Sequence, residues 1–213
     1  GGVNVYVVKS RSDGRQWGAP ILAASGMACS AKARELRDGT LLLPVYGPSA
    51  DRPKRTFDNA VVRSTDHGAT WSTPIPLPRN SGHSHDETDV LELPDGRLLA
   101  MMRPCMCRCT SRDGGLTWTD TEPVGFEGHA PCLLRTAKGV LLVAHRLPGT
   151  ALHYSLDDGA TWQGPVVLDT VIGAYPGLVE LPDGRVLCVY YEEGKGSAIR
   201  QVVFGVGPQG ILL

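Results

Sequence analysis

One eight-residue motif recurs along the chain and constrains the fold more than any other feature of the sequence. Its form is Ser-x-Asp-x-Gly-x-Thr-Trp, with close copies at residues 64–71, 111–118 and 155–162 and a more divergent copy at residues 10–17. The Asp carboxylate can accept backbone N–H bonds within a turn, the Gly can adopt positive φ, and the Trp ring can pack on a sheet. Because one catalytic centre does not need four copies of an octamer, we interpret it as a structural turn rather than an acidic catalytic motif.

A second motif alternates with the octamer and predicts β-hairpins. It reads Glu-Leu-x-Asp-Gly before apolar residues at 35–42, 92–99 and 180–187, and a variant with Lys-Gly lies at 135–142. Asp-Gly between two apolar strands is a strong short-range hairpin signal. The chain therefore predicts a unit of four antiparallel strands, with the hairpin between the first two and the octamer between the last two. Such a unit, repeated every ~40–50 residues, is the blade of a β-propeller.

The predicted fold class is all-β, and we expect residues 1–213 to form a single partial β-propeller domain. The pattern predicts full blades at 26–80, 81–125 and 126–170, a remnant of an earlier blade at 1–25, and the first strands of a partial last blade at 171–213. The 26 Gly and 16 Pro residues favour many tight turns and argue against a helical bundle.

Composition excludes several classes of function. The chain has 21 Lys and Arg against 22 Asp and Glu, which excludes binding to a nucleic acid through bulk charge. No apolar run approaches the roughly 20 residues that a membrane-spanning helix needs. We therefore expect neither a nucleic acid nor a membrane as a partner. No signal peptide can be identified from residue 1 onward, and the cellular location is left open.

The chemically informative residues fall at one end of the predicted blades. In a propeller blade the first strand starts, and the second ends, at the same end of the central channel. Alignment on the hairpin glycines places Glu87 and Tyr175 at the starts of first strands, and Arg103 and Arg146 at the ends of second strands. Strict pairing would point these two registers to opposite faces of a sheet. We expect the strand ends to depart from the pleat there, so that all four side chains face the channel.

These four residue types together favour chemistry on an anionic sugar. Two arginines can hold a planar carboxylate by charge-assisted hydrogen bonds. A phenol beside a carboxylate can lose its proton and act as a nucleophile. A tyrosine nucleophile is unusual in glycoside hydrolysis, where sialidases are the exception that uses it. A neutral phenol avoids the repulsion that a carboxylate nucleophile would meet from an anionic sugar.

At these residues the sequence resembles the sialidase (neuraminidase) superfamily, whose members are six-bladed propellers with BNR repeats. The octamer resembles the family's Asp-box. Residues 86–103 (DETDVLELPDGRLLAMMR) are similar to the segment with the glutamate partner and one arginine of the family's triad. Residues 174–184 (AYPGLVELPDG) resemble the segment with the nucleophilic tyrosine, and Arg146 matches a further triad arginine more loosely. The resemblance spans essentially the whole chain.

The resemblance implies an exo-acting, retaining glycoside hydrolase that removes terminal sialic acid or a related anionic sugar from glycoconjugates. It implies catalytic roles for Tyr175 and Glu87 and substrate binding by Arg103 and Arg146. The expected partner is a sialylated glycan or another anionic-sugar substrate, and no cofactor is expected. The family's first triad arginine and its Asp acid/base have no match in the chain.

The length of the chain agrees with the absence of the segment that would carry these two residues. A six-bladed ring needs roughly 270 residues at ~45 residues per blade. Since Gly1 is not a Met, we expect the chain to be an N-terminally truncated part of a larger propeller, with little or no activity alone.

Two other functions fit the same pattern. An Asp-box propeller can bind a glycan or a protein without catalysis, since fold does not determine function. A propeller glycosidase acting on another, uncharged sugar is also open, although the arginines would then have no purpose. Individual residues have structural alternatives too, because Tyr175 could be a packed aromatic residue and either arginine could pair with neighbouring acids. His129 and His145 flank the rim positions, and whether they line the pocket is left open, whereas we expect Glu192 and Glu193 to be solvated.

Six cysteines raise the question of a metal site. Cys105, Cys107 and Cys109 alternate, so on a strand their sulfurs would share one face. Zinc is the sharper interpretation, but no Cys-x-x-Cys or His-x-x-x-His pair accompanies them, so we expect small buried residues, with no disulfide required at this length. A second cluster of possible ligands is short in sequence and has no distant partner. It comprises His83, His85 and Asp86. We therefore expect no metal at either cluster.

Overall fold

The computed structural model of the chain describes residues 3–50, 56–80, 84–171 and 173–212. Within these ranges the secondary structure consists of β-strands, and no helix is present that could cross a membrane. The strands form four four-stranded antiparallel sheets and one two-stranded sheet. The predicted all-β class is therefore confirmed.

Strands adjacent in sequence pair within each sheet. The two-stranded sheet contains β1 (Asn4–Val7) and β2 (Ile21–Ser25). The next sheets contain β3 (Arg34–Glu35), β4 (Leu41–Pro48), β5 (Phe57–Ser64) and β6 (Ile75–Pro76), then β7 (Thr88–Glu92), β8 (Leu98–Met102), β9 (Cys107–Ser111) and β10 (Glu122–Pro123). The last two contain β11 (His129–Arg135), β12 (Leu141–Arg146), β13 (Thr150–Ser155) and β14 (Gln163–Asp169), then β15 (Gly173–Glu180), β16 (Val186–Glu192), β17 (Ile199–Gly207) and β18 (Gly210–Leu212).

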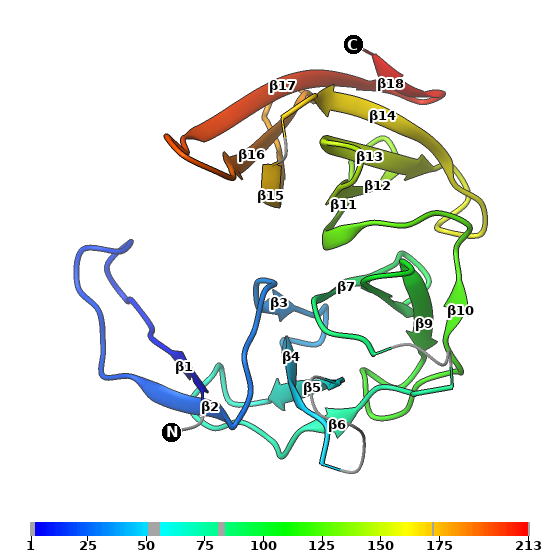
Figure 1. Ribbon diagram of the computed structural model, residues 1–213. Helices are drawn as coiled ribbons and strands as arrows, with labels where there is room; N and C mark the ends of the chain where they lie inside the picture. Colours follow the sequence, from blue (N-terminus) through cyan, green and yellow to red (C-terminus); the bar gives the residue numbers. More distant parts are fainter. Residues whose placement is uncertain (1–2, 51–55, 81–83, 172, 213) are drawn as a thin grey trace.

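The sheets are arranged as blades around a common centre. Figure 1 shows an arc in which β3, β7, β11 and β15 lie nearest the centre, with the arc open between β1–β2 and the last sheet. A separate apolar cluster fills each interface between neighbouring sheets; for example, Val90 and Leu42 pack together, and Leu133 and Leu99 belong to the next cluster. Burial between sheets therefore holds the blades side by side. This is the β-propeller that the repeats predict, with about four blades' worth of strands.

The octamer forms the turn between the third and fourth strands of a blade. In the copy between β5 and β6, the Asp66 carboxylate accepts hydrogen bonds from the backbone N–H groups of Ala69 and Thr70 and from the hydroxyls of Ser64 and Thr70. Gly68 has a φ of 77°, a conformation that favours glycine. Asp113 and Asp157 make the corresponding bonds to their Thr and Ser partners in the other two close copies. The interpretation as a structural turn is confirmed.

The last sheet differs from the sequence expectation. The repeats predict only the first strands of a blade within residues 171–213, but four strands are present. The fourth, β18, has three residues and pairs with the end of β17 through Gly207 and Gly210. Such a short strand next to glycines has no apolar alternation from which to predict it. The assignment of residues 1–213 to one partial domain stays a prediction.

Candidate functional site

Three sheets converge on one carboxylate at the end of the blades. Glu87 directly precedes β7, and the residue is only 4% exposed. Its Oε1 accepts a 2.5 Å hydrogen bond from the Tyr175 hydroxyl on β15. Its Oε2 accepts bonds of 3.0 Å from Arg103 Nη1 and from the backbone N–H of Ala130 on β11. The structure thus brings together three of the four residues that the sequence singled out.

The pairing of β7 and β8 explains why Glu87 meets Arg103. Thr88 pairs with Met102, and one step further the Arg103 N–H donates to the Glu87 carbonyl at 3.1 Å. Residues directly opposite each other in a ladder project their side chains to the same face. The expectation that strict pairing would separate the two registers was therefore wrong. In this blade the regular ladder itself brings the carboxylate and the guanidinium together.

Tyr175 reaches the same point by an irregularity in the strand. The pairing of β15 with β16 shifts between Ala174, opposite Tyr191, and Gly177, opposite Val189. The shift is a β-bulge, and Tyr175 within it has a φ of 49°. Positive φ is uncommon for a bulky residue and occurs where the surrounding structure enforces it, often at functional sites. The bulge re-aims the tyrosine ring at the site, where it stacks on Tyr191 with ring centroids 6.1 Å apart.

A matching bulge on β11 completes the cradle around Glu87. There the pairing shifts between His129, opposite Arg146, and Cys132, opposite Ala144, and Ala130 has a φ of 53°. The bulge turns the Ala130 N–H toward the carboxylate. Because a buried carboxylate without donors is costly, this backbone N–H stabilises Glu87 and fixes it in place.

The pKa of Tyr175 indicates that the proton between Tyr175 and Glu87 is on the phenol. Burial, followed by the hydrogen bond to Glu87 and its negative charge, raises the pKa of Tyr175 above its ordinary value. The phenol is therefore protonated at neutral pH and donates to the carboxylate. Glu87 is positioned to receive that proton when the phenol oxygen forms a new bond.

Arg103 is held by two neighbouring acids. Its Nε lies 2.7 Å from Asp86 Oδ1, and its Nη1 bonds Glu87. The structural alternative, in which this arginine pairs with adjacent carboxylates, is what the structure shows. Burial raises the pKa of Asp86 despite the positive charge of Arg103. In the sequence Asp86 stands out only as a possible metal ligand, although its place next to Glu87 was a signal for this role.

Arg146 lies at the end of β12 and has different partners. Its Nη1 forms a 2.7 Å ion pair with Glu193, and its Nη2 lies 3.4 Å from His129 Nδ1. Glu193 is exposed, as expected, and the strand ends of two neighbouring blades also bring it to Arg146. Glu192 was also expected to be solvated, but it pairs with Arg200 at 2.7 Å.

His129 contacts Arg146 and feels the charges of both arginines. Burial and then the charges of Arg103 and Arg146 lower the pKa of His129, so its imidazole is neutral at neutral pH. His145 does not line the site, because it is fully buried on β12, where its Nε2 lies 2.8 Å from Nδ1 of His153 on β13.

A cavity of about 410 Å³ opens beside the site along the inner strands. Tyr175, Ala130 and Asp89 line it, together with residues of the segment before β3 such as Lys32. Neither Arg103 nor Arg146 belongs to its lining. Tyr175 therefore stands at the boundary between this cavity and the charged group around Glu87.

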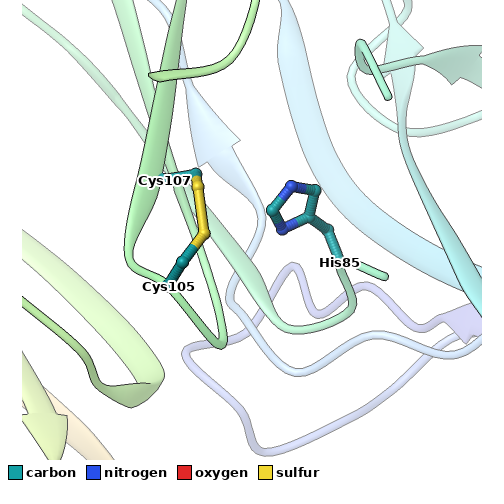
Figure 2. Close-up of side chains that lie close together, drawn as sticks. All are labelled: His85, Cys105 and Cys107. Carbon is teal, nitrogen blue, oxygen red and sulfur yellow. A yellow bond between two sulfur atoms is a disulfide. The ribbon is translucent and has the colours of Figure 1, made fainter. Parts of the chain in front are cut away.

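The cysteines depart from the sequence expectation. Cys105 and Cys107 form a disulfide, whereas the sequence predicts small buried residues at these positions. Cys105 lies in the turn after β8, and Met106 has a φ of 45°, so the alternation of a strand begins only at Cys107. Figure 2 shows His85 beside the disulfide. His83 lies outside the described residues.

Comparisons with known proteins identify the relatives of this fold and site. Residues 1–188 match the family model of the BNR repeat-like domain. The anhydrosialidase of Macrobdella decora is 34% identical over 89 residues, which is 40% of this chain and 11% of that protein. The sialidase of Micromonospora viridifaciens is 30% identical over 183 residues, which is 71% of this chain and 27% of that protein. The chain thus spans well under half the length of either relative.

A solved structure extends the likeness to the fold. The intramolecular trans-sialidase from Ruminococcus gnavus, in complex with oseltamivir carboxylate, superposes with a TM-score of 0.75 at 17% identity. The likeness covers 95% of this chain and 50% of that one. At this identity it supports the propeller fold alone.

Proposed function

The chain belongs to the BNR-repeat sialidase superfamily, and from that membership we propose that its site carries out retaining hydrolysis of a terminal sialic acid or a related anionic sugar. The observation that carries the proposal is the 2.5 Å hydrogen bond from the Tyr175 hydroxyl to the buried Glu87 carboxylate. A phenol joined to a carboxylate that can take its proton is the arrangement that a tyrosine nucleophile requires.

In the first step the Tyr175 oxygen attacks the anomeric carbon and its proton passes to Glu87 Oε1. The bond to the leaving glycan oxygen breaks, and that oxygen needs a proton from an acid, the role of the family's Asp that has no match in this sequence. Water then attacks the anomeric carbon and gives a proton to the carboxylate that the same acid left behind, the glycosyl–tyrosine bond breaks, and Glu87 returns its proton to the phenol oxygen. Each of the two displacements inverts the anomeric carbon, so its configuration is retained overall.

The arginines have the substrate carboxylate as their proposed ligand. Arg103 and Arg146 are partly exposed, with side chains 27% and 19% accessible, and each is now paired with protein carboxylates. A substrate carboxylate would compete for guanidinium N–H groups that Asp86 and Glu193 now occupy. A cationic site of this kind favours an anionic sugar over a neutral one.

The test uses a difluorinated sialic acid as a trap. Its fluoride leaving group departs without being protonated, so labelling requires Tyr175 and Glu87 but not the missing acid. We expect intact-mass and peptide analysis to find one glycosyl adduct on Tyr175, and we expect Tyr175→Phe to abolish it. Tyr191→Phe is the matched control, because this ring stacks on Tyr175 without a hydrogen bond to Glu87, and it should still be labelled.

Two results would contradict the proposal. An adduct on another residue would refute the role of Tyr175. Binding of sialic acid without any adduct, weakened by Arg103→Ala, would instead favour a glycan-binding propeller without catalysis.

A further inference from the structure

A second group of chemically active side chains lies in the segments just before β7 and around the start of β9. It comprises His85, Cys105 and Cys107, whose ligand atoms all lie within 4.8 Å of one another. His85 and Cys107 are buried, and Cys105 is partly exposed. We propose that reduction of the Cys105–Cys107 disulfide creates a binding site for a zinc-like divalent cation, held by both thiolates and the His85 imidazole. This site does not depend on the proposed hydrolase function.

The donor set selects the class of metal. Thiolate and imidazole ligands favour Zn²⁺ and similar soft or borderline ions over Mg²⁺ and Ca²⁺, which prefer oxygen. Bonds of about 2.3 Å to sulfur and about 2.0 Å to nitrogen put tetrahedral donors roughly 3.5–3.8 Å apart. Since the three donor atoms already lie within 4.8 Å, they need shifts of only about an ångström to reach that geometry. Water from the side of Cys105 would complete the coordination.

The orientation of His85 fits a metal ligand. Its Nδ1 lies 3.1 Å from the backbone carbonyl of Arg103. A carbonyl oxygen can only accept, so Nδ1 carries the proton and the neutral ring has its lone pair on Nε2. Metal-ligating histidines usually donate their other N–H to a carbonyl or a carboxylate in this way. Figure 2 shows the edge of the ring that carries both nitrogens facing the disulfide.

The redox step needs a named reductant. A water-soluble phosphine attacks one sulfur, the S–S bond breaks, and water supplies the phosphine-oxide oxygen and the two protons of the new thiols. The cation then displaces both thiol protons as it binds the sulfurs. Reduction therefore changes this turn from a covalent disulfide to a pair of metal ligands.

The experiment compares the oxidised and reduced 213-residue chain, the latter freed of phosphine under argon. Each is titrated with Co²⁺, whose thiolate charge-transfer band reports sulfur ligation, and the band is then displaced with Zn²⁺. We expect one Co²⁺ per reduced chain and no band in the oxidised chain. A reduced chain without the band, or equal binding by both forms, would overturn the proposal.

Variants locate the site. The double variant Cys105→Ser, Cys107→Ser should abolish the Co²⁺ band. His85→Gln should weaken the affinity for Co²⁺ by about tenfold or more. Cys29→Ser is the control and should leave the band and the affinity unchanged, because this free cysteine is outside the cluster. A band that persists in the double variant would place the metal at other thiols and refute the assignment. Peptide mapping gives a readout that needs no variant: Zn²⁺, but not Mg²⁺, should protect Cys105 and Cys107 of the reduced chain from alkylation.

Discussion

The Tyr175 hydroxyl and the Glu87 carboxylate are 88 residues apart in sequence and 2.5 Å apart in space. The carboxylate also accepts one bond from Arg103 and one from the Ala130 backbone, so three blades meet on two oxygen atoms. A buried anion with three donors is both a folding constraint and a fixed proton acceptor. Removing any one donor therefore tests stability and chemistry together.

The hydroxyl of Tyr175 should contribute to stability as well as to the proposed reaction. In Tyr175→Phe, Glu87 Oε1 loses its hydrogen bond in a site where Glu87 is only 4% exposed. We expect the free energy of unfolding to fall by about 1–3 kcal/mol, measured by urea denaturation. Tyr191→Phe loses a bond to the more exposed Glu193 and should change it by less than about 0.5 kcal/mol. If both substitutions lower the free energy of unfolding equally, the buried hydrogen bond contributes no more to stability than the exposed one.

The ion pair between Arg34 and Asp89 should matter far more than those at the surface. Asp89 Oδ2 lies 2.5 Å from Arg34 Nη2 and accepts the Leu133 N–H, while the Asp89 side chain is 2% exposed. Arg34→Met leaves this buried charge without its counter-ion and should cost about 3–5 kcal/mol of unfolding free energy.

The matched control for Arg34 is an exposed pair of the same type. Arg200 and Glu192 lie 2.7 Å apart with side chains 41% and 30% exposed, so Arg200→Met should lower the free energy of unfolding far less than Arg34→Met does. Both values come from denaturant titration at the same ionic strength. If Arg34→Met and Arg200→Met lower the free energy of unfolding by similar amounts, burial does not make the Arg34–Asp89 pair more stabilising than the exposed pair.

The repeats predicted the propeller fold, and together with the family resemblance they predicted that Glu87 and Tyr175 meet, but they missed the last strands of the final sheet. Spacing from the hairpin glycines carries that information, because each blade repeats the same register. The bulges were not predictable, since neither Ala130 nor Tyr175 is a glycine and their positive φ values arise from tertiary contacts. The partners Glu193 and Asp86 were missed for a related reason. Both ion pairs depend on how strand ends approach each other, and residue type alone does not encode that approach.

Two glycines with similar backbone conformations allow backbone strain to be separated from crowding. Gly159, in an octamer turn, has a φ of 87°, and a Cβ there would lie 3.2 Å from Leu99 Cδ2 and 3.4 Å from Leu141 Cδ2. Gly39, in a hairpin, has a similar φ of 84°, but a Cβ there would have no neighbouring atom within 4 Å. Gly39→Ala should therefore cost about 1 kcal/mol from conformation alone.

Gly159→Ala adds contact with the interface between two blades to that same strain. We expect it to cost roughly 1–3 kcal/mol more than Gly39→Ala, because the leucines must shift in a packed core. Thermal or urea unfolding of the two single variants measures the difference directly. A cost for Gly159→Ala no larger than that for Gly39→Ala would mean that the packing under the octamer can adapt.

The buried histidine pair should make stability depend on mild acid. Burial and then the nearby His153 lower the pKa of His145 to about 4, while an unfolded histidine titrates near 6.5. Between these values the unfolded chain binds more protons than the folded one, so the folded state loses stability as the pH falls. The loss from pH 7 to 4 should be on the order of 2–3 kcal/mol for this residue. His153 and His129, whose pKa values are also lowered by burial, act in the same direction.

A neutral side chain at position 145 should flatten this dependence. His145→Gln cannot be protonated, so its unfolding free energy should fall less between about pH 7 and 4.5 than that of the unmodified chain. His67→Asn is the control, because His67 is exposed in an octamer turn and Asn tolerates its φ of 56°. Carboxylates titrate in the same range in every variant, so only the difference between the slopes reports on His145. Parallel stability curves for the unmodified chain and His145→Gln would locate the acid sensitivity elsewhere.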